Sequence, residues 1–221
     1  MTNKPPVTRN MKIAQWSIPV MLLAILGISS YGPIQKQLRA AEMTSANGNI
    51  KCLYVALFSY ASDHDGHFPT NLKSDSPTAA ACFDKLIKAG KIDEELIFWN
   101  KKNAHTISSA STSPPNEVSP LTENENTTGY VMGLTTRSPT NIPILFDSST
   151  EAGTFNTSVW EGRVIIAKLN GSVAHMTISE INEFQNIQNK GYILEKRGGE
   201  VVDIFQDLPE GTKILPPQIA Q

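Results

Sequence analysis

The hydrophobic and polar positions divide the start of the chain into an apolar run and an amphipathic helix. From Ile13 to Tyr31 no side chain is charged at neutral pH. Such a run, as a helix, spans about 28 Å, close to the thickness of a bilayer core. Trp16 and Tyr31 lie near its ends, where interfacial aromatic residues are favoured. The pattern therefore predicts a transmembrane anchor over residues 13–31, preceded by a cytoplasmic tail over residues 1–12.

A cleaved signal peptide is the alternative interpretation of this run. Lys4, Arg9 and Lys12 form a basic leader, and the most apolar block extends only from Ile18 to Ile28. Both interpretations carry the remainder of the chain out of the cytoplasm. The anchor implies a single-pass inner-membrane protein whose N-terminus is cytoplasmic and whose globular domain is periplasmic or extracellular.

Residues 32–69 are predicted to continue as an amphipathic helix that ends in a polar turn. Apolar residues recur there at three- and four-residue spacing, which places them on one helical face. They are Ile50, Leu53, Tyr54, Leu57, Phe58 and Ala61. A kink is expected at Gly32-Pro33 and a bent turn near Gly48. After the helix, Gly66 supplies a position for positive φ and Pro69 prevents continuation.

Shorter patterns predict a mixture of helix and strand in residues 70–187. Thr78 to Ala89 is predicted to be a short helix ended by Gly90, and Ile92 to Trp99 a short helix or a strand. Residues 100–126 are rich in Ser, Thr, Pro and Asn and predict a long surface loop. Strands are expected at Tyr130–Thr135, Ile142–Phe146, Gly162–Leu169 and Ser172–Thr177. The last two would be joined by a hairpin turn at Asn170-Gly171, since both residues accept positive φ.

The C-terminal part is predicted to hold a helix, a hairpin and an irregular tail. The helix would run from Ile178 to about Asn189, with Thr177 or Ser179 as its cap. Residues 188–221 would then form a hairpin of Tyr192–Lys196 with Val201–Phe205, followed by irregular chain from Gln206.

The turn after the second helical half carries a family resemblance. An apolar helix that runs into N-x-x-x-x-L-x-x-Y-x-x-D-x-x-G-x-F-P resembles bacterial pilin-like proteins related to type II secretion pseudopilins. The residues at this spacing are Leu57, Tyr60, Asp63, Gly66, Phe68 and Pro69, and Asn49 and Tyr54 (where the family prefers Leu) precede them on the same predicted helix. Segments Gly129–Thr135, Ile142–Asp147 and Val164–Val173 are similar to later parts of the family pattern. The resemblance covers roughly residues 13–185.

This resemblance implies an α+β, pilin-like fold in which a long N-terminal helix packs on an antiparallel β-sheet. It also implies a membrane-anchored structural protein without enzymatic activity, a minor pseudopilin whose partners are other pilin-like subunits or secretion-system components. Residues 11–15 lack the Gly, Phe and Glu of prepilins. A recognisable prepilin peptidase site is therefore not expected.

Charge and candidate chemistry leave two further functional hypotheses open. A net charge of −2 gives no argument for nucleic acid. An extracytoplasmic binding module for a polysaccharide or an envelope protein is the alternative function. A metal-dependent periplasmic enzyme is the third hypothesis, because Asp63–His67 contains ligand-type side chains to which His105 or His175 could add another. The same residues are explained more simply as a helix-terminating turn. We therefore predict no catalytic residue, no cofactor-binding residue and no metal site.

The two cysteines leave a question of covalent structure. Cys52 and Cys82 both fall on predicted helices outside the cytoplasm. They could form a disulfide between the first and second helices. The alternative is two buried free thiols.

Overall fold

The computed structural model describes residues 9–72, 74–100, 120–122, 125–147, 149–157, 159–180, 190–197 and 200–217. For residues 9–31 and some strand positions it describes the backbone alone. The chain forms two compact units, Met1–Glu42 and Met43–Gln221.

The described residues of the first unit are helical. They belong to α1, which spans Arg9–Ser62 and continues without a break through Gly32-Pro33. The predicted anchor, residues 13–31, lies outside the residues whose side chains are described. In the part of the chain that the structure describes, no helix has both the length and the apolar character that crossing a membrane requires.

The second unit combines the end of α1 with shorter helices and three sheets. After α1 the described elements are α2 (Ala79–Lys88), η1 (Glu95–Phe98), β1 (Thr128–Met132), β2 (Pro143–Asp147), β3 (Ser149–Glu151), β4 (Thr154–Asn156), η3 (Val159–Glu161), β5 (Arg163–Lys168), β6 (Val173–Thr177), β7 (Ser179–Glu180), β8 (Lys190–Tyr192), β9 (Leu194–Arg197), β10 (Glu200–Asp203) and β11 (Lys213–Leu215).

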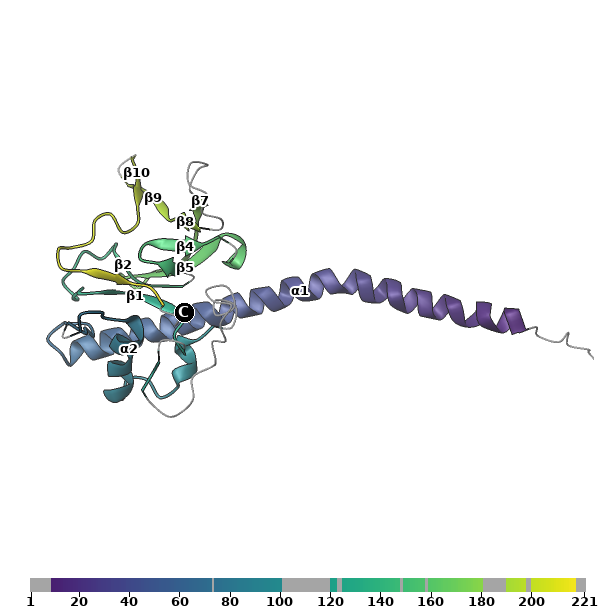
Figure 1. The fold of residues 1–221 in the computed structure, drawn as a ribbon, viewed down its shortest axis with the longest axis horizontal. Coiled ribbons are helices and arrows are strands. Elements are labelled where there is room, and N and C mark those ends of the chain that lie inside the picture. The colour runs from purple at the N-terminus through teal and green to yellow at the C-terminus, as the bar shows by residue number, and fades with distance from the viewer. Residues whose placement is uncertain are drawn as a thin grey trace, which may run out of the picture. The chain divides into compact units, whose positions relative to one another are not determined.

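A central antiparallel sheet of five strands, in the order β11-β1-β2-β5-β6, organises this unit. The end of α1 and helix α2 lie on one side of it, and the small sheets β3-β4-β8-β7 and β10-β9 lie on the other (Figure 1). The predicted α+β architecture of a long helix and an antiparallel sheet is therefore confirmed. All four strands predicted between Tyr130 and Thr177 are present, with bounds shifted by a few residues.

The face of α1 that packs on the sheet is the one that helical spacing predicts. Ile50, Leu53, Leu57 and Ala61 are at most 3% exposed, and Tyr54 and Phe58 pack at the margin of the same core. Helix α1 continues through Gly48, where the sequence predicts a bent turn. Burial of this apolar face stabilises the helix–sheet contact, since removing apolar surface from water is the main favourable term in folding.

The polar turn after α1 docks on the loop that follows β1. Gly66 has the predicted positive φ of 82°, and Asp65 also lies in this region with φ 53°. The Gly66 N–H donates to the Ala61 carbonyl (2.8 Å), and the Gly66 carbonyl accepts from the Thr136 N–H (2.9 Å). The buried Tyr130 hydroxyl on β1 donates to the Pro69 carbonyl (3.0 Å). The turn therefore serves both to end the helix and to attach it to the sheet.

Tyr130→Phe is expected to lower the free energy of unfolding by about 2 kcal/mol, because it leaves the buried Pro69 carbonyl without its donor. Tyr54→Phe is the matched comparison. Its hydroxyl donates to the Leu169 carbonyl (2.9 Å) from a partly exposed position, so water can replace it and a loss below about 1 kcal/mol is expected. Urea unfolding of both variants, followed by circular dichroism, measures the difference. Equal losses would contradict the attachment of the turn through Tyr130.

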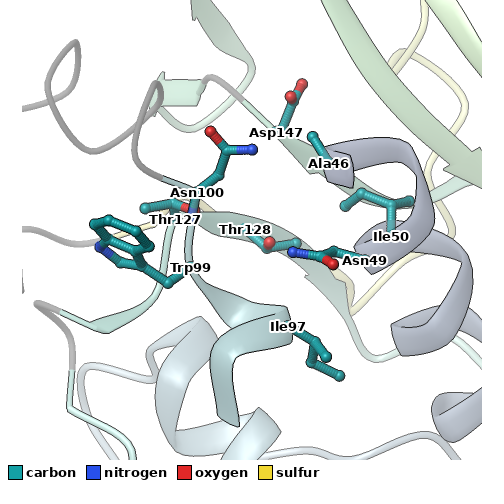
Figure 2. A pocket seen from close by; sticks show the side chains of 9 residues that line it. All are labelled: Ala46, Asn49, Ile50, Ile97, Trp99, Asn100, Thr127, Thr128 and Asp147. Carbon is teal, nitrogen blue, oxygen red and sulfur yellow. The ribbon is translucent and has the colours of Figure 1, made fainter. Parts of the chain in front are cut away.

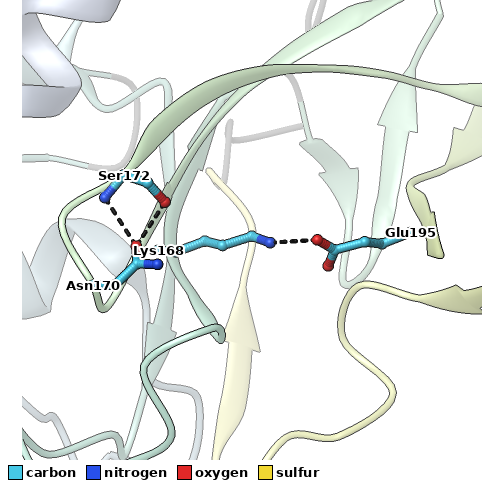
Figure 3. Close-up of polar contacts among 4 residues, drawn as sticks. All are labelled: Lys168, Asn170, Ser172 and Glu195. Carbon is cyan, nitrogen blue, oxygen red and sulfur yellow. Dashed lines mark hydrogen bonds and ion pairs between the residues drawn. The ribbon is translucent and has the colours of Figure 1, made fainter. Parts of the chain in front are cut away.

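The predicted hairpin between β5 and β6, with its turn at Asn170-Gly171, is confirmed. Gly171 alone has positive φ (82°), and its N–H donates to the Lys168 carbonyl (3.0 Å). The Lys168 N–H donates to the Ser172 carbonyl (2.9 Å), so the loop has three residues, with a glycine bulge. The Asn170 side-chain oxygen accepts from the Ser172 N–H (2.9 Å) and hydroxyl (2.6 Å) (Figure 3). These bonds give the Ser172 N–H and hydroxyl an acceptor within the turn.

Lys168 links the central sheet to the hairpin of β9 and β10. Its Nζ lies 2.7 Å from Glu195 Oε1 on β9, as Figure 3 shows. The predicted hairpin of residues 192–205 is present as β9 and β10, which form a two-stranded sheet of their own. Phe205, after β10, adds an aromatic contact to the same interface. The centroid of its ring lies 5.4 Å from that of Phe146 on β2.

Two sequence predictions in the C-terminal part require correction. The helix predicted from Ile178 is wrong where it can be described, since Ser179–Glu180 is β7 and pairs with β8; residues 181–189 lie outside the described residues. The tail after Gln206 is not irregular throughout, because Lys213–Leu215 pairs with β1 as β11. These strands are too short for their periodicity to be recognised, and hydrogen bonds to distant partners define them.

Residues 92–127 differ from the prediction in part. Glu95–Phe98 forms a 3₁₀-helix, so the short helix is confirmed over fewer residues and the strand alternative is wrong. The predicted loop 100–126 is not at the surface near its end, because Leu121 and Asn126 are only 5% and 1% exposed. The Asn126 amide bonds both the N–H and the carbonyl of Thr128, which satisfies its buried polar atoms. Residues 101–119 lie outside the described residues.

Candidate functional site

A small cleft lies where α1 meets the start of β1 and the end of β2. Polar and apolar side chains from α1, from η1 and the two residues after it, and from the start of β1 and the end of β2 surround it (Figure 2). They are Ala46, Asn49, Ile50, Ile97, Trp99, Asn100, Thr127, Thr128 and Asp147. Its volume of about 10 Å³ is enough for one water molecule. The cleft therefore fits a structural water better than an organic substrate.

Asp147, at the wall of the cleft, is buried and accepts two short hydrogen bonds. Its side chain is 2% exposed, Oδ2 accepts from Trp160 Nε1 (2.7 Å), and Oδ1 accepts from the Ile165 N–H (2.6 Å). Because each carboxylate oxygen already accepts a short hydrogen bond, we interpret Asp147 as a structural residue. It joins β2, η3 and β5 at one point.

The turn that Asp147 holds has an unusual backbone. Trp160, Glu161 and Gly162 have φ of 47°, 58° and 78°, so three consecutive residues lie in the left-handed region. A non-glycine residue there costs on the order of 1 kcal/mol or more, and surrounding contacts must offset this cost. The sequence patterns do not predict this turn. Gly162 is the one residue of this turn whose type favours positive φ. The Asp147–Trp160 contact joins residues that are 13 positions apart, so no local pattern reveals it.

The ligand-type residues of the Asp63–His67 turn do not converge on a common point. Asp63 pairs with Lys91 (2.5 Å), whose hydrogen bond and charge lower the pKa of that carboxyl below its ordinary value. His64 stacks on the Tyr60 ring (3.8 Å between centroids), and its Nδ1 lies 2.8 Å from the Tyr60 carbonyl. His67 forms a backbone bridge with Thr135. This arrangement fits the helix-terminating turn.

The histidines and acidic residues do not gather into a metal site where they are described. Within the residues that the structure describes, no group of three or more His, Cys, Asp and Glu side chains is placed to hold a metal ion. His105 lies outside those residues. His175 is an exposed residue of β6. The Asp63–His67 turn contacts the loop after β1, and strands β2 and β5 lie between β1 and β6 in the sheet.

The two cysteines are both free, so the disulfide interpretation is wrong. The alternative of two buried free thiols is right for Cys82 and wrong for Cys52. Cys52 is exposed, whereas Cys82 is fully buried with its Sγ 3.8 Å from Met132 Sδ. Burial raises the pKa of the Cys82 thiol to about 11, so this thiol stays protonated at neutral pH. Only Cys52 is accessible to thiol reagents.

His175 has cationic neighbours from two other elements. Partial burial is the largest cause that lowers its pKa below the ordinary value, followed by the positive charges of Arg163 on β5 and Lys51 on α1. All three side chains belong to exposed residues. The His175 imidazole therefore lies at the surface, beside two positive charges.

Arg163→Gln is expected to raise the pKa of His175, because it removes a neighbouring positive charge, and Lys51→Gln to raise it less. A lowered folded-state pKa means that the unfolded chain binds the proton first on acidification. The contribution of His175 to stability therefore falls as pH decreases through the unfolded-state pKa. An NMR titration of the imidazole protons, assigned with His175→Gln, measures the shift. The exposed Arg137→Gln is the control, and an equal shift there would contradict the assignment.

Compared with known proteins, the chain matches no family model, no curated protein and no solved structure.

Proposed function

We propose that the chain is a membrane-anchored, pilin-like structural protein of the minor pseudopilin type, which serves a type II secretion system or a related assembly. The observation that carries this proposal is the packing of Met43–Ser62 of α1 on an antiparallel sheet, with the following turn attached to β1 through Tyr130 and Pro69. The order of helix, turn and sheet is the one that the resemblance implies. The proposal assigns no enzymatic activity.

The residues of the resembling motif have physical roles that support this proposal. Leu57 and Phe68 are 0% and 2% exposed in the core. Asp63 pairs with Lys91 after α2, and Gly66 takes a conformation that side chains disfavour. The motif therefore describes how a helix ends and docks on a sheet, which is the part of the pattern that an N-terminal anchor would present outside the membrane.

Under this proposal residues 13–31 anchor the chain in the inner membrane, with the N-terminus cytoplasmic and the globular unit periplasmic. Ile34 and Leu38, which follow this run, lie one helical turn apart and are 51% and 53% exposed. Exposed apolar residues at this spacing favour contact with lipid headgroups or with another helix.

Membrane fractionation of the full chain tests the anchor. The double variant Leu22→Arg with Ile25→Arg is expected to lose membrane retention, since each charge at a helix centre costs about 3 kcal/mol on insertion. The control is Leu72→Arg, at a residue 70% exposed, which should stay in the membrane fraction. The mass of the mature N-terminus provides the second readout. A cut near Ser30 with release of the domain would overturn the anchor.

Cross-linking at Cys52 tests the structural role. Because Cys52 is exposed and Cys82 is buried, a thiol-specific cross-linker added to intact cells attaches at one position. Adducts with pilin-like subunits or secretion-system components, lost in Cys52→Ser, are expected. Adducts with none of these components, in cells where the chain is membrane-bound, would contradict the pseudopilin role and leave the anchor intact.

A further inference from the structure

Among the described residues, the outer edge of β6 is an open strand edge. In the order β11-β1-β2-β5-β6, strand β6 is terminal, and within the part of the chain that the structure describes it pairs with β5 alone. The Lys168 N–H donates to the Ser172 carbonyl at one end of this pair, and the Ile178 N–H donates to the Gly162 carbonyl at the other. Antiparallel pairs alternate between bonded and non-bonded positions.

This alternation places the unused backbone groups. Counting from the two bonded ends, Ala174 and Met176 exchange hydrogen bonds with β5. The N–H and carbonyl groups of Val173, His175 and Thr177 point away from β5, toward the open edge. Strand β6 therefore offers three residues on which another strand could form a ladder.

The two edges of the central sheet differ in their protection. Strand β11 has three residues, begins with the exposed Lys213 and is followed directly by Pro216-Pro217. Short strands, lysine and proline are devices that prevent pairing at an edge. Strand β6 has five residues, Val-Ala-His-Met-Thr, and a register with β5 free of bulges. Among the described residues, strand β6 itself contains no lysine, no proline and no bulge.

Two positively charged side chains, those of Arg163 and Lys51, lie near this edge, next to His175. Because Arg163 pairs with Thr177 and Ile165 with His175, the side chains of Arg163 and His175 lie on the same face as diagonal neighbours. The charge of Lys51 on α1 acts on His175 from the adjacent layer. Among the described residues, neither Arg163 nor Lys51 forms an ion pair. This group therefore has the charge that complements carboxylates.

We propose that the open edge of β6 binds an extended, acidic segment of a partner protein as an additional strand, with the carboxylates of that segment over Lys51, Arg163 and His175. Alternate residues of a strand point to one face, so acidic side chains are required at every second position. The backbone ladder supplies affinity and the basic group selects the sequence. This inference does not depend on the membrane anchor or on secretion.

Hydrogen exchange of the purified full chain with a defined probe tests the ladder. The probe is a short synthetic peptide in which valine alternates with glutamate, and the matched control peptide has lysine in place of glutamate. Without peptide, the amides of Val173, His175 and Thr177 are expected to exchange rapidly and those of Ala174 and Met176 slowly. The glutamate peptide should slow the first three amides at least tenfold, and the lysine peptide should not.

Substitutions separate the backbone from the charges. Thr177→Pro removes one outward N–H without a bond to β5, and should abolish peptide binding measured by fluorescence anisotropy. Ala174→Thr, on the opposite face of the same strand, should bind as the parent does. Arg163→Gln and Lys51→Gln should each weaken binding about threefold to tenfold.

Three results would overturn the proposal. The first is equal binding of the two peptides, and the second is unchanged amide exchange at saturating glutamate peptide. The third is a chain that is dimeric through β6 and is not dissociated by the peptide, which would assign the edge to a second copy. If Thr177→Pro does not fold, the exchange pattern of the parent decides alone.

Discussion

Replacing Asp147 with alanine is expected to lower the free energy of unfolding by about 4 kcal/mol, a large part of the stability of an ordinary domain. The carboxylate is 2% exposed and accepts from Trp160 Nε1 and the Ile165 N–H at 2.7 and 2.6 Å. Alanine leaves both donors buried without an acceptor, and each such donor costs about 1 to 3 kcal/mol. The left-handed turn at Trp160–Gly162 also loses the contact that offsets its strain.

The conservative variant Asp147→Asn distinguishes shape from hydrogen bonding. Asparagine fills nearly the same volume but has one acceptor oxygen, so its NH₂ group would face one of the two donors. A loss of about 3 kcal/mol is expected, much closer to that of alanine than to the parent. Asp75→Ala is the matched control, because Asp75 is exposed and surface substitutions are usually within about 0.5 kcal/mol.

Urea unfolding of the full chain measures these differences. Tryptophan fluorescence provides a second readout, since the contribution of Trp160, one of three tryptophans, should shift to longer wavelength in Asp147→Ala before global unfolding. A loss below about 1 kcal/mol in Asp147→Ala would show that Trp160 and Ile165 find other acceptors. The turn would then be held by packing of Val159 and Trp160, which are 0% and 3% exposed.

The parts of the fold that could be predicted are those with a local pattern. The apolar face of α1 follows helical spacing, and α2 begins after Thr78, whose side chain caps the Ala81 N–H (3.2 Å). Its end is marked by Gly90 with φ of 63°. Strands β2 and β5 are continuous apolar runs because both faces of the central sheet are covered. In each case a window of a few residues contains the signal.

The parts that could not be predicted depend on long-range pairing. Strand β11 is three residues long and pairs with β1, more than eighty residues earlier. Strand β8 pairs with both β4 and β7, and its own composition gives no sign of this. The Asp147–Trp160 contact is of the same kind. An aspartate at the end of an apolar strand could equally be a solvated strand end, and only the fold reveals its two donors.

The same limit applies to function. The Asp63–His67 turn contains ligand-type residues, yet its side chains bond Lys91 and Tyr60 in different directions. The basic group of Lys51, Arg163 and His175 could not be predicted, because α1, β5 and β6 bring together residues from separate parts of the sequence. Helix and turn patterns support an anchoring and structural role, whereas the binding surface depends on strand order.

Gly129→Ala is expected to destabilise the chain by about 3 kcal/mol for a purely steric reason. A Cβ at Gly129 would lie 2.0 Å from Cε2 and 2.5 Å from Cζ of Phe146, which is opposite it on β2. The φ of Gly129 is not positive, so alanine would fit its backbone conformation. The cost therefore comes from the ring of Phe146, which covers the position where a side chain would be.

The Phe146 ring has no room to move aside. It is fully buried, and its centroid lies 5.7 Å from that of Phe155 on β4 and 5.4 Å from that of Phe205. These aromatic rings join the central sheet to the smaller sheets. Overpacking at Gly129 should therefore disturb the contact between the layers as well as the pairing of β1 with β2.

A double-mutant cycle with Phe146→Leu tests this explanation. Phe146→Leu alone should cost about 1 to 2 kcal/mol through lost contacts. The double variant should lose about 1 to 2 kcal/mol less unfolding free energy than the two single variants lose in sum, because leucine leaves free the space that the new methyl group at position 129 needs. Gly48→Ala is the control for glycine replacement as such. Gly48 lies within α1, and a Cβ added to it would meet no atom within 4 Å, so alanine there should stabilise the helix by about 0.5 to 1 kcal/mol. Strict additivity in the cycle would mean that Phe146 is not the obstacle, and the requirement for glycine at position 129 would then have to come from the backbone of β1.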